Sequence, residues 1–281
     1  MLPFADPPLS QQAFAFLAEL VHDRSRIRLG PDKQALVAGR LGPRLQSLGC
    51  TSFDDYVHLL ASAEGEEEIG AVIDLISTNH TQFFREPAHF EILRERVLPV
   101  LAERAGASGR ELRIWSAAAA SGEEAYSVAI VLAEFCRGRV GLEWRVFASD
   151  ISRRMLVACR QGIYEAGKVE LPDAQWLPRH FQEGIGAREG FYRVRPELRR
   201  RVVTTHVNLF QDAYPVPGDL DVIFCRNVMI YFDVESRRVL VDRLFRQLAP
   251  GGFLFVGHSE SLLGLGARFK AAWPSVYVKP S

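Results

Sequence analysis

Three short segments of the chain combine small, charged and aromatic residues that could do chemistry. Residues 78–86 and 221–233 mix amide, guanidinium, carboxylate and aromatic side chains. Residues 115–127 contain a run of alanines, a serine and a glycine, followed by Glu123 and Glu124. Small residues let a ligand approach the backbone, and the first N–H groups of a helix are free to donate hydrogen bonds. The third of these segments is therefore a candidate ligand-binding turn.

The chemistry of this turn excludes one common ligand class. It lacks the G-x-G-x-x-G pattern that seats a pyrophosphate. Glu123 and Glu124 would repel a pyrophosphate and would suit a cationic or hydroxyl-rich ligand, although they could equally complement a helix dipole. Asp150 ends the next predicted strand, where a carboxylate can bind ribose hydroxyls or instead cap the following helix. Together these residues favour an adenosine ligand without a diphosphate, and S-adenosylmethionine fits that description.

Alternating strand and helix patterns must position these residues. Strands are predicted at 111–117, 144–150, 220–226 and 252–258, with helices at 122–136, 152–161 and 235–248. This alternation predicts a doubly wound α/β fold with a parallel sheet covered on both faces. The β-like segments 191–195 and 201–207 interrupt it, and we interpret them as a small antiparallel insert spanning about 167–207. Residues 269–279 could supply an antiparallel final strand.

The first part of the chain has a different pattern. Residues 1–76 predict a compact helical domain, because their apolar side chains recur at helical spacing. Ser52 and Asp55 resemble a capping box at the start of one of its helices. The polar stretch 77–88 is expected to be a linker that contributes to the ligand site. Residues 89–281 are expected to form the α/β domain.

Composition narrows the classes of protein further. The chain has 281 residues, no net charge at pH 7 and four scattered cysteines. Zero net charge gives no global field that would recruit nucleic acid or a membrane. The cysteines lack metal-ligand spacing, and the first residues lack the features of a signal peptide. No window approaches the roughly 20 apolar residues of a membrane span. We expect a cytoplasmic protein with no metal, no nucleic-acid partner and no membrane insertion.

The three segments together resemble one family, the chemotaxis receptor methyltransferases (the CheR family). The resemblance is carried by Thr-Asn-His-Thr-Gln-Phe-Phe-Arg-Glu at 78–86, by Trp-Ser-Ala-Ala-Ala-Ala-Ser-Gly-Glu-Glu-Ala-Tyr-Ser at 115–127 and by Asp-Val-Ile-Phe-Cys-Arg-Asn-Val-Met-Ile-Tyr-Phe-Asp at 221–233. Shorter matches lie at 147–151 and 257–261. The resemblance implies a class I S-adenosylmethionine-dependent methyltransferase domain (Rossmann-like) with a small antiparallel β insert, preceded by an all-α domain. It also implies methyl transfer to glutamate side chains of methyl-accepting chemotaxis receptors, with S-adenosylhomocysteine as product.

The same resemblance assigns roles to individual residues. Two are catalytic candidates, Arg85 and Tyr231. The cofactor contacts that it implies are Asn79, Thr81, Arg85, Glu124, Asp150, Asn208, Leu209, Cys225 and Arg226. Asp150 would hold the ribose, Asn208 and Leu209 would lie near the adenine, and Cys225 would contribute through its backbone. Each also has a structural alternative, since Asn208 could end a strand and Leu209 could belong to the core.

The expected reaction needs positioning more than proton transfer. A glutamate acceptor has a reference pKa near 4.3, so it is already an anion at pH 7 and needs no general base. Arg85 could orient the acceptor carboxylate or the carboxylate of the cofactor, although it could instead form a surface ion pair with Glu86 or Glu91. Tyr231 could donate a hydrogen bond near the reacting oxygen, or it could be a core aromatic residue with its hydroxyl at the rim.

Two surfaces are candidates for partner binding. The helical domain has a local excess of cations that could dock the glutamate-rich helices of a receptor, although such a run is commonly a solvated face. These cations are Arg24, Arg26, Arg28, Lys33, Arg40 and Arg44. In the family the β insert can bind a short peptide at the receptor C-terminus. Residues 184–190 resemble the short-loop form of members that do so.

Two other functions remain open at this stage. The cofactor loop reads Ala-Ser-Gly-Glu-Glu-Ala, where the family usually has Ser-Thr-Gly-Glu-Glu and often Pro next. We expect this departure to change the affinity for the cofactor more than the activity. A non-catalytic S-adenosylmethionine-binding sensor or scaffold is therefore an alternative. The other is a nucleic-acid or small-molecule methyltransferase on the same fold. Enzymes that methylate amino groups of DNA place Asp/Asn-Pro-Pro-Tyr after the fourth strand, and this chain has Cys-Arg-Asn-Val at 225–228.

Overall fold

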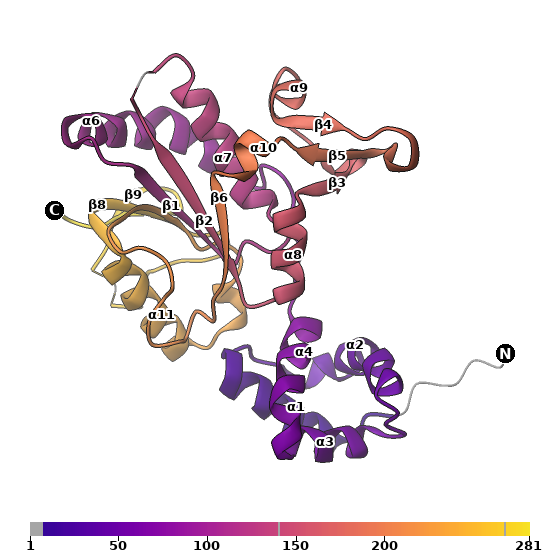
Figure 1. Cartoon of the computed structure of the whole chain (residues 1–281). Coiled ribbons are helices and arrows are strands. Elements are labelled where there is room, and N and C mark those ends of the chain that lie inside the picture. Colours follow the sequence, from indigo (N-terminus) through magenta and orange to yellow (C-terminus); the bar gives the residue numbers. More distant parts are fainter. Residues whose placement is uncertain (1–7, 140, 267) are drawn as a thin grey trace. The chain divides into compact units, whose positions relative to one another are not determined.

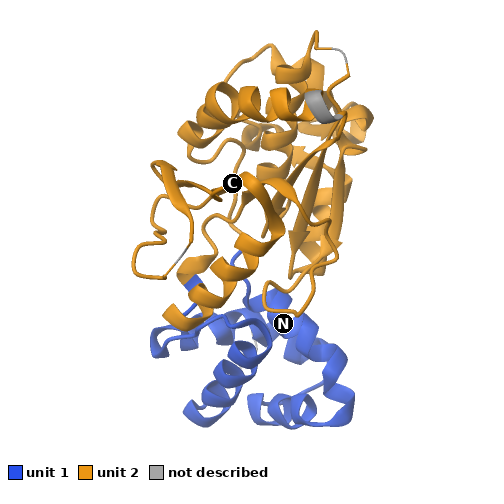
Figure 2. Cartoon of the chain, turned by 90° about the vertical axis from the view of Figure 1, so that its left-hand side faces the viewer, with its two compact units in different colours: residues 1–78, 231–233 blue, residues 79–230, 234–281 orange. Residues whose placement is uncertain are grey.

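The computed structural model describes residues 8–139, 141–266 and 268–281 (Figure 1). Contacts between residues divide the chain into two compact units (Figure 2). The first unit comprises residues 1–78 and 231–233, and the second comprises residues 79–230 and 234–281. No helix in the described ranges is long and apolar enough to cross a membrane.

The first unit is helical. Its helices are α1 Gln11–Ser25, α2 Gln34–Ser47, α3 Phe53–Ala61 and α4 Glu66–Ile76, with short 3₁₀ turns η1 Pro31–Lys33 and η2 Ala63–Gly65 between them. The predicted capping box is confirmed, because Ser52 accepts a hydrogen bond from the Asp55 N–H and Asp55 accepts one from the Ser52 N–H. Each helix buries apolar side chains on one face, among them Leu17, Leu41 and Val72. The helices thus enclose a core of their own.

A buried carboxylate links three helices of this unit. Glu68 on α4 accepts two hydrogen bonds from Arg44 on α2, at 2.9 and 2.6 Å, and one of 2.7 Å from the Tyr56 hydroxyl on α3. Burial alone would raise the pKa of Glu68, but Arg44 and Tyr56 outweigh burial and lower it below its ordinary value. The glutamate is therefore ionised in the folded protein and fastens the bundle.

The second unit contains a mixed seven-stranded sheet in the order β6-β2-β1-β7-β8-β10-β9. Its strands are β1 Leu112–Ala117, β2 Trp144–Asp150, β6 Val202–His206, β7 Leu220–Phe224, β8 Leu248–Phe255, β9 Lys270–Trp273 and β10 Val276–Val278. The first five strands of the order are parallel, and β10 runs antiparallel to β8 and β9. Parallel strands end at one common edge of a sheet, so the loops that follow β1, β2, β7 and β8 gather there.

Helices lie on both sides of this sheet (Figure 1). They are α5 Pro87–Ile92, α6 Leu98–Ser108, α7 Glu123–Cys136, α8 Arg153–Gln161 and α11 Val234–Gln247, with a π-helical turn η3 Leu93–Val97 between α5 and α6. Pro87 occupies the first turn of α5, as its fixed φ favours. The doubly wound α/β architecture predicted from the alternating pattern is confirmed.

A small antiparallel sheet is present, but its strands differ from those predicted. Its order is β3-β5-β4, with β3 Ile163–Glu165, β4 Phe181–Glu183 and β5 Phe191–Val194, and the short helices α9 Trp176–His180 and α10 Pro196–Arg199 lie beside it in sequence. The assignment of residues 201–207 to this insert is wrong. Residues 202–206 form β6, which pairs in parallel with β2 in the main sheet. A β-branched pattern predicts an extended backbone, but it does not identify the strand with which that backbone pairs.

Two adjacent phenylalanines anchor the segment that joins the units in sequence. Phe83 packs edge-on against Tyr164 and Phe181, with ring centroids 4.9 and 5.6 Å away. Phe84 packs against Phe90 at 5.0 Å, and its N–H donates to the Ser127 hydroxyl at 2.9 Å. Residues 79–88, expected to be a linker, group with the second unit. The backbone around residue 85 is therefore held against the core of that unit.

Replacing Glu68 by Gln should lower the free energy of unfolding of the helical unit by about 1–2 kcal/mol at pH 7, a loss limited by the partial exposure of Arg44. A lowered folded pKa stabilises the protein above the unfolded pKa near 4.3, and this stabilisation is lost as the pH falls through the folded value. Urea unfolding followed by circular dichroism should therefore show a gap between the two proteins at pH 7 that shrinks towards pH 3. The exposed Glu67→Gln is the control, and equal midpoints for all three proteins at pH 7 would contradict the prediction.

Candidate active site at the carboxyl edge of the sheet

Asp150 organises the loops at the carboxyl ends of β1 and β2. Its side chain is buried, with one oxygen accepting the Ala120 N–H and the other the Ser152 N–H, both at 2.8 Å. Ser152, in turn, caps α8 by accepting the Met155 N–H at 3.1 Å. Asp150 therefore fastens the small-residue turn to the end of β2. A carboxylate at this place is chemically suited to accept hydrogen bonds from ribose hydroxyls.

The turn between β1 and α7 has an unusual backbone. Ala118, Ala120 and Gly122 have φ values of 71°, 47° and 102°. Residues other than glycine rarely adopt positive φ values of this kind. A Cβ on Gly122 would lie 2.6 Å from the Cys159 sulfur, so only glycine fits there. Strained backbone of this kind occurs at ligand-binding sites, where the surrounding structure enforces it. Here Asp150 supplies part of that constraint.

A buried arginine connects three of the site segments. Arg226 follows β7, and its side chain is 1% exposed. One of its terminal nitrogens donates to Glu124 at 3.1 Å, and the other donates to Glu86 at 2.9 Å and to the backbone carbonyl of Arg85. Glu124 also accepts a 2.7 Å hydrogen bond from the Ser116 hydroxyl. Arg226 thereby joins the start of α7 to the segment that carries Arg85.

The pKa values of the two carboxylates that share Arg226 are shifted in opposite directions. Burial alone would raise the pKa of Glu86, but the hydrogen bond and charge of Arg226, with help from Asn227, lower it to about 2. Burial raises the pKa of Glu124 above its ordinary value, and Arg226 and Ser116 only partly oppose this. Glu86 is therefore ionised at pH 7 and compensates the charge of Arg226.

A second carboxylate fixes the loops after β7 and β8. Glu260 accepts backbone hydrogen bonds from Gly257 at 2.6 Å, Met229 at 2.7 Å and Asn227 at 2.8 Å. A Cβ on Gly257 would lie 2.5 Å from the Asn227 side chain, so this position needs glycine. The Asn227 amide also donates to Glu86 at 3.2 Å. The sequence motifs include Glu86, Asn227 and Glu260, but they predict no role for Asn227 or Glu260 and suggest only an ion pair with Arg85 for Glu86, which instead pairs with Arg226.

The structure gathers most of the sequence-predicted residues at this edge. Val207 donates to the Asp150 carbonyl at 3.1 Å, which places Asn208 directly beyond Asp150 on the neighbouring strand. Asn208 accepts the Phe210 N–H at 2.9 Å, and Leu209 is buried. Leu209 therefore belongs to the core, as its structural alternative expected, whereas Asn208 follows β6 and does not end it. The cofactor roles of both residues stay predictions. Cys225 is buried and donates its N–H to the Phe255 carbonyl at 2.9 Å.

The contacts of four other predicted site residues do not indicate what role each has. Arg85 is half-buried and donates to the His80 carbonyl at 3.1 Å, and no ion pair to it is found among the described side chains. Asn79 and Thr81 are half-buried. Tyr231 ends the 3₁₀ turn η6 Met229–Tyr231 and groups with the first unit. The roles of these four residues in the site stay predictions.

The donor set suits S-adenosylmethionine better than a dinucleotide. Asp150 offers a carboxylate at the end of β2. The turn that follows β1 begins with alanines, so it places no large side chain over the backbone next to that carboxylate. Glu86 and Glu124 together with one arginine make the local charge negative or neutral, which tolerates a cationic ligand. The doubly wound sheet with antiparallel final strands and this donor set define a class, the S-adenosylmethionine-dependent methyltransferases.

Comparison with known proteins gives the family. Residues 79–278 match the SAM binding domain of CheR methyltransferases, and residues 12–77 match the all-alpha domain of CheR methyltransferases. The chain belongs to the CheR methyltransferase family.

Curated relatives match over nearly the whole chain. A chemotaxis protein methyltransferase of Escherichia coli is 42% identical over 269 residues, which cover 96% of this chain and 91% of that protein. The Salmonella typhimurium protein of the same name is 41% identical, with coverage of 96% and 90%. A chemotaxis protein methyltransferase of Borreliella burgdorferi is 33% identical, with coverage of 96% and 95%.

Replacing Arg226 by Lys should destabilise the second unit by about 3 kcal/mol, because an ammonium cannot reach Glu86, Glu124 and the Arg85 carbonyl together. All four tryptophans of the chain lie in that unit, so their fluorescence during urea unfolding reports on it. Arg238→Lys, at a position whose side chain is 51% exposed, should change the midpoint little. If Arg226→Lys and Arg238→Lys unfold at the same urea concentration, the contacts of Arg226 contribute little to the stability of the second unit.

Proposed function

We propose that this chain transfers a methyl group from S-adenosylmethionine to glutamate side chains of methyl-accepting chemotaxis receptors. The observation that carries the proposal is the match to both CheR domains, with relatives named chemotaxis protein methyltransferase that are 41–42% identical over 96% of the chain. The alternative of a binding scaffold without turnover gains no support from the site, because the Glu123 and Glu124 pair is intact and Glu124 is bound to Arg226.

The chemistry of a glutamate acceptor fits a site without a general base. A carboxylate with a pKa near 4.3 is a nucleophilic anion at pH 7. S-adenosylmethionine, when bound, supplies a methyl group activated by its sulfonium. The protein then has to orient the acceptor carboxylate in line with the methyl group. Such positioning lowers the activation barrier of methyl transfer substantially. Methyl transfer to a carboxylate gives a glutamate methyl ester.

We assign Asp150 to the ribose hydroxyls and Asn208 and Leu209 to the adenine environment. The support is their place beside each other at the ends of β2 and β6. Asn79 and Thr81, the Cys225 backbone, and Arg226 with Glu124 complete the proposed cofactor site. In this arrangement Arg226 acts mainly by fixing Glu124 and the Arg85 backbone.

We assign Arg85 to the carboxylate of the acceptor or of the cofactor. Its neighbours Phe84 and Glu86 both have left-handed backbone, with φ values of 52° and 59°, and Arg226 binds the Arg85 carbonyl. The backbone of Arg85 is thus fixed while its side chain is half-buried with a single backbone partner. A planar guanidinium in such a place suits bidentate binding of a carboxylate. Tyr231 is proposed as a hydrogen-bond donor near the reacting oxygen.

The helical unit is proposed to dock the receptor helices, through fewer cations than the sequence suggests. Arg24 and Arg44 each form a two-bond ion pair with a glutamate of α4, and Arg40 donates to backbone carbonyls at the end of α4. Arg26 and Arg28 are exposed, and neither has a side-chain partner among the described residues. These two arginines are therefore the best candidates for contact with an acidic helix.

The small sheet is proposed as a second contact, to a peptide at the receptor C-terminus. Both β3 and β4 are edge strands, and an extended peptide can add to such an edge. The loop after β4 is tight, because a Cβ on Gly184 would lie 1.9 Å from the Arg188 carbonyl oxygen. Ile185 in that loop is 85% exposed, which leaves an apolar side chain for a partner to cover.

Incubation with methyl-labelled S-adenosylmethionine and receptor-containing membranes tests the proposed function. We expect label on the receptor that mild base releases, as an ester requires. Arg85→Ala should reduce this transfer by a factor of roughly 100 or more, because loss of a positioning contact costs this much, while its circular dichroism spectrum stays native. Arg94→Ala, which removes an exposed pair with Glu95, is the matched control. Base-stable label, label on nucleic acid, or full activity of Arg85→Ala would contradict the assignments.

The double variant Arg26→Glu, Arg28→Glu should raise KM for the receptor roughly tenfold, which corresponds to about 1.4 kcal/mol. Its Kd for S-adenosylmethionine should not change, and the effect should shrink at high salt because exposed charges are screened. Arg154→Glu, on an exposed position in the second unit, should leave KM unchanged. The same assay on a receptor without its C-terminal residues examines the peptide contact. Equal KM values for the intact and shortened receptors would exclude the peptide contact, and an unchanged KM for the double variant would exclude the proposed docking surface.

A further inference from the structure

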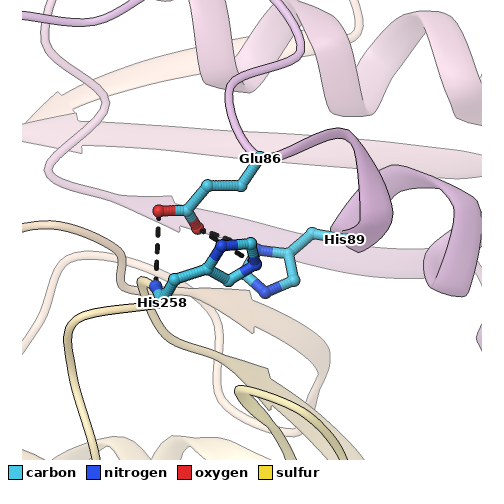
Figure 3. Close-up of side chains that lie close together, drawn as sticks. All are labelled: Glu86, His89 and His258. Atoms are coloured by element: carbon cyan, nitrogen blue, oxygen red, sulfur yellow. Dashed lines mark hydrogen bonds and ion pairs between the residues drawn. The ribbon is translucent and has the colours of Figure 1, made fainter.

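A cluster of two histidines and a glutamate lies beside the proposed site without a role in methyl transfer (Figure 3). Glu86 precedes α5, His89 lies on α5, and His258 follows β8. His89 is completely buried, and neither of its ring nitrogens has a hydrogen-bond partner of good geometry among the residues that the structure describes. A buried imidazole with two unsatisfied nitrogens is unusual, because burying a polar group without a partner costs free energy.

The three side chains point toward one another (Figure 3). Glu86 Oε2 lies 3.3 Å from His89 Nδ1 and 4.0 Å from His258 Nε2. One potential ligand atom from each residue lies within 4.8 Å of the others. Two ligands bound to a tetrahedral ion at about 2.0–2.1 Å are separated by about 3.4 Å. The pair Glu86 and His89 already has this spacing.

His258 can supply the remaining adjustment. Its side chain is 54% exposed and lies in the loop after β8, whereas His89 is enclosed. A rotation that moves the imidazole by about 1 Å would bring His258 to the tetrahedral ligand separation. The exposed imidazole of His258 places one of the three candidate ligands in contact with solvent.

We propose that Glu86, His89 and His258 bind one divalent transition-metal ion of the Zn²⁺ type. Two imidazoles and one carboxylate form a mixed set of nitrogen and oxygen ligands. The imidazole nitrogens favour Zn²⁺, Co²⁺ or Ni²⁺ over Mg²⁺ or Ca²⁺, which prefer oxygen ligands alone. The ion would bind a nitrogen of His89 that has no hydrogen bond to any residue in the described part of the chain. Solvent completes the coordination on the exposed side.

Arg226 limits the affinity of this site. Its guanidinium donates to the same oxygen, Glu86 Oε2, at 2.9 Å, so the ion and the arginine share one carboxylate atom. Glu124 shares the guanidinium and offsets part of its charge. A bound ion would tie α5 to the loop after β8, next to the backbone carbonyl of Arg85 that Arg226 binds.

Titration of the full chain with Co²⁺ tests the proposal, because bound Co²⁺ has a visible spectrum that reports its ligands and geometry. We expect one equivalent to bind with nitrogen and oxygen ligands. His258→Ala should weaken binding by more than about tenfold, since even outer-shell changes cost that much. This variant should fold normally because the side chain is largely exposed. His58→Ala, at an exposed histidine of the helical unit, is the matched control and should bind like the parent chain.

A second readout uses Zn²⁺ and thermal unfolding. An ion that binds only the folded chain raises the melting temperature of the parent and of His58→Ala, and should not raise that of His258→Ala. Failure of Co²⁺ to bind, equal binding by His258→Ala, or a thiolate-to-metal charge-transfer band that indicates cysteine ligands would overturn the proposal. None of these measurements depends on methyl transfer, so the result is independent of the proposed function.

Discussion

One buried guanidinium holds the carboxyl edge of the sheet together. Arg226 contacts Glu86, Glu124 and the carbonyl of Arg85, which come from segments far apart in the sequence. A charge that is 1% exposed must be compensated by opposite charge and hydrogen bonds, because its desolvation is otherwise very costly. The positions of these segments are therefore coupled. A shift of any one of them would leave a buried charge without its partner.

The strained backbone of the site depends on this same edge. Ala118 and Ala120 adopt left-handed φ beside β1, and Phe84 and Glu86 do so on either side of Arg85. Each such residue costs free energy and persists only where neighbouring contacts enforce it. Asp150 binds the Ala120 N–H. The aromatic packing of Phe84 and the ion pair of Glu86 serve the same purpose for the other segment.

Local chemistry in the sequence was sufficient for much of the fold. The alternation of strands and helices, the capping box at Ser52 and the place of Asp150 at the end of β2 follow from periodicity, side-chain capping and strand polarity. The pairing of β6 did not follow, because residues 202–206 have the same β-branched character whether they join the small sheet or the main one. The choice depends on which neighbour buries that strand.

The class of fold, the family resemblance and the segments that carry the chemistry could all be predicted from the sequence, because these depend on residue types at fixed local spacing. Which side chains contact one another became known from the three-dimensional arrangement of the elements. Arg24 and Arg44, which the sequence suggested as docking residues, form ion pairs with Glu66 and Glu68 of α4 within the helical unit. The tertiary structure also brought Glu86 to Arg226 and to His258, which lie more than 130 residues away in the sequence, whereas the contact with His89 is a local i,i+3 pair. Long-range contacts are set by the packing of whole helices and strands, so local sequence patterns do not predict them.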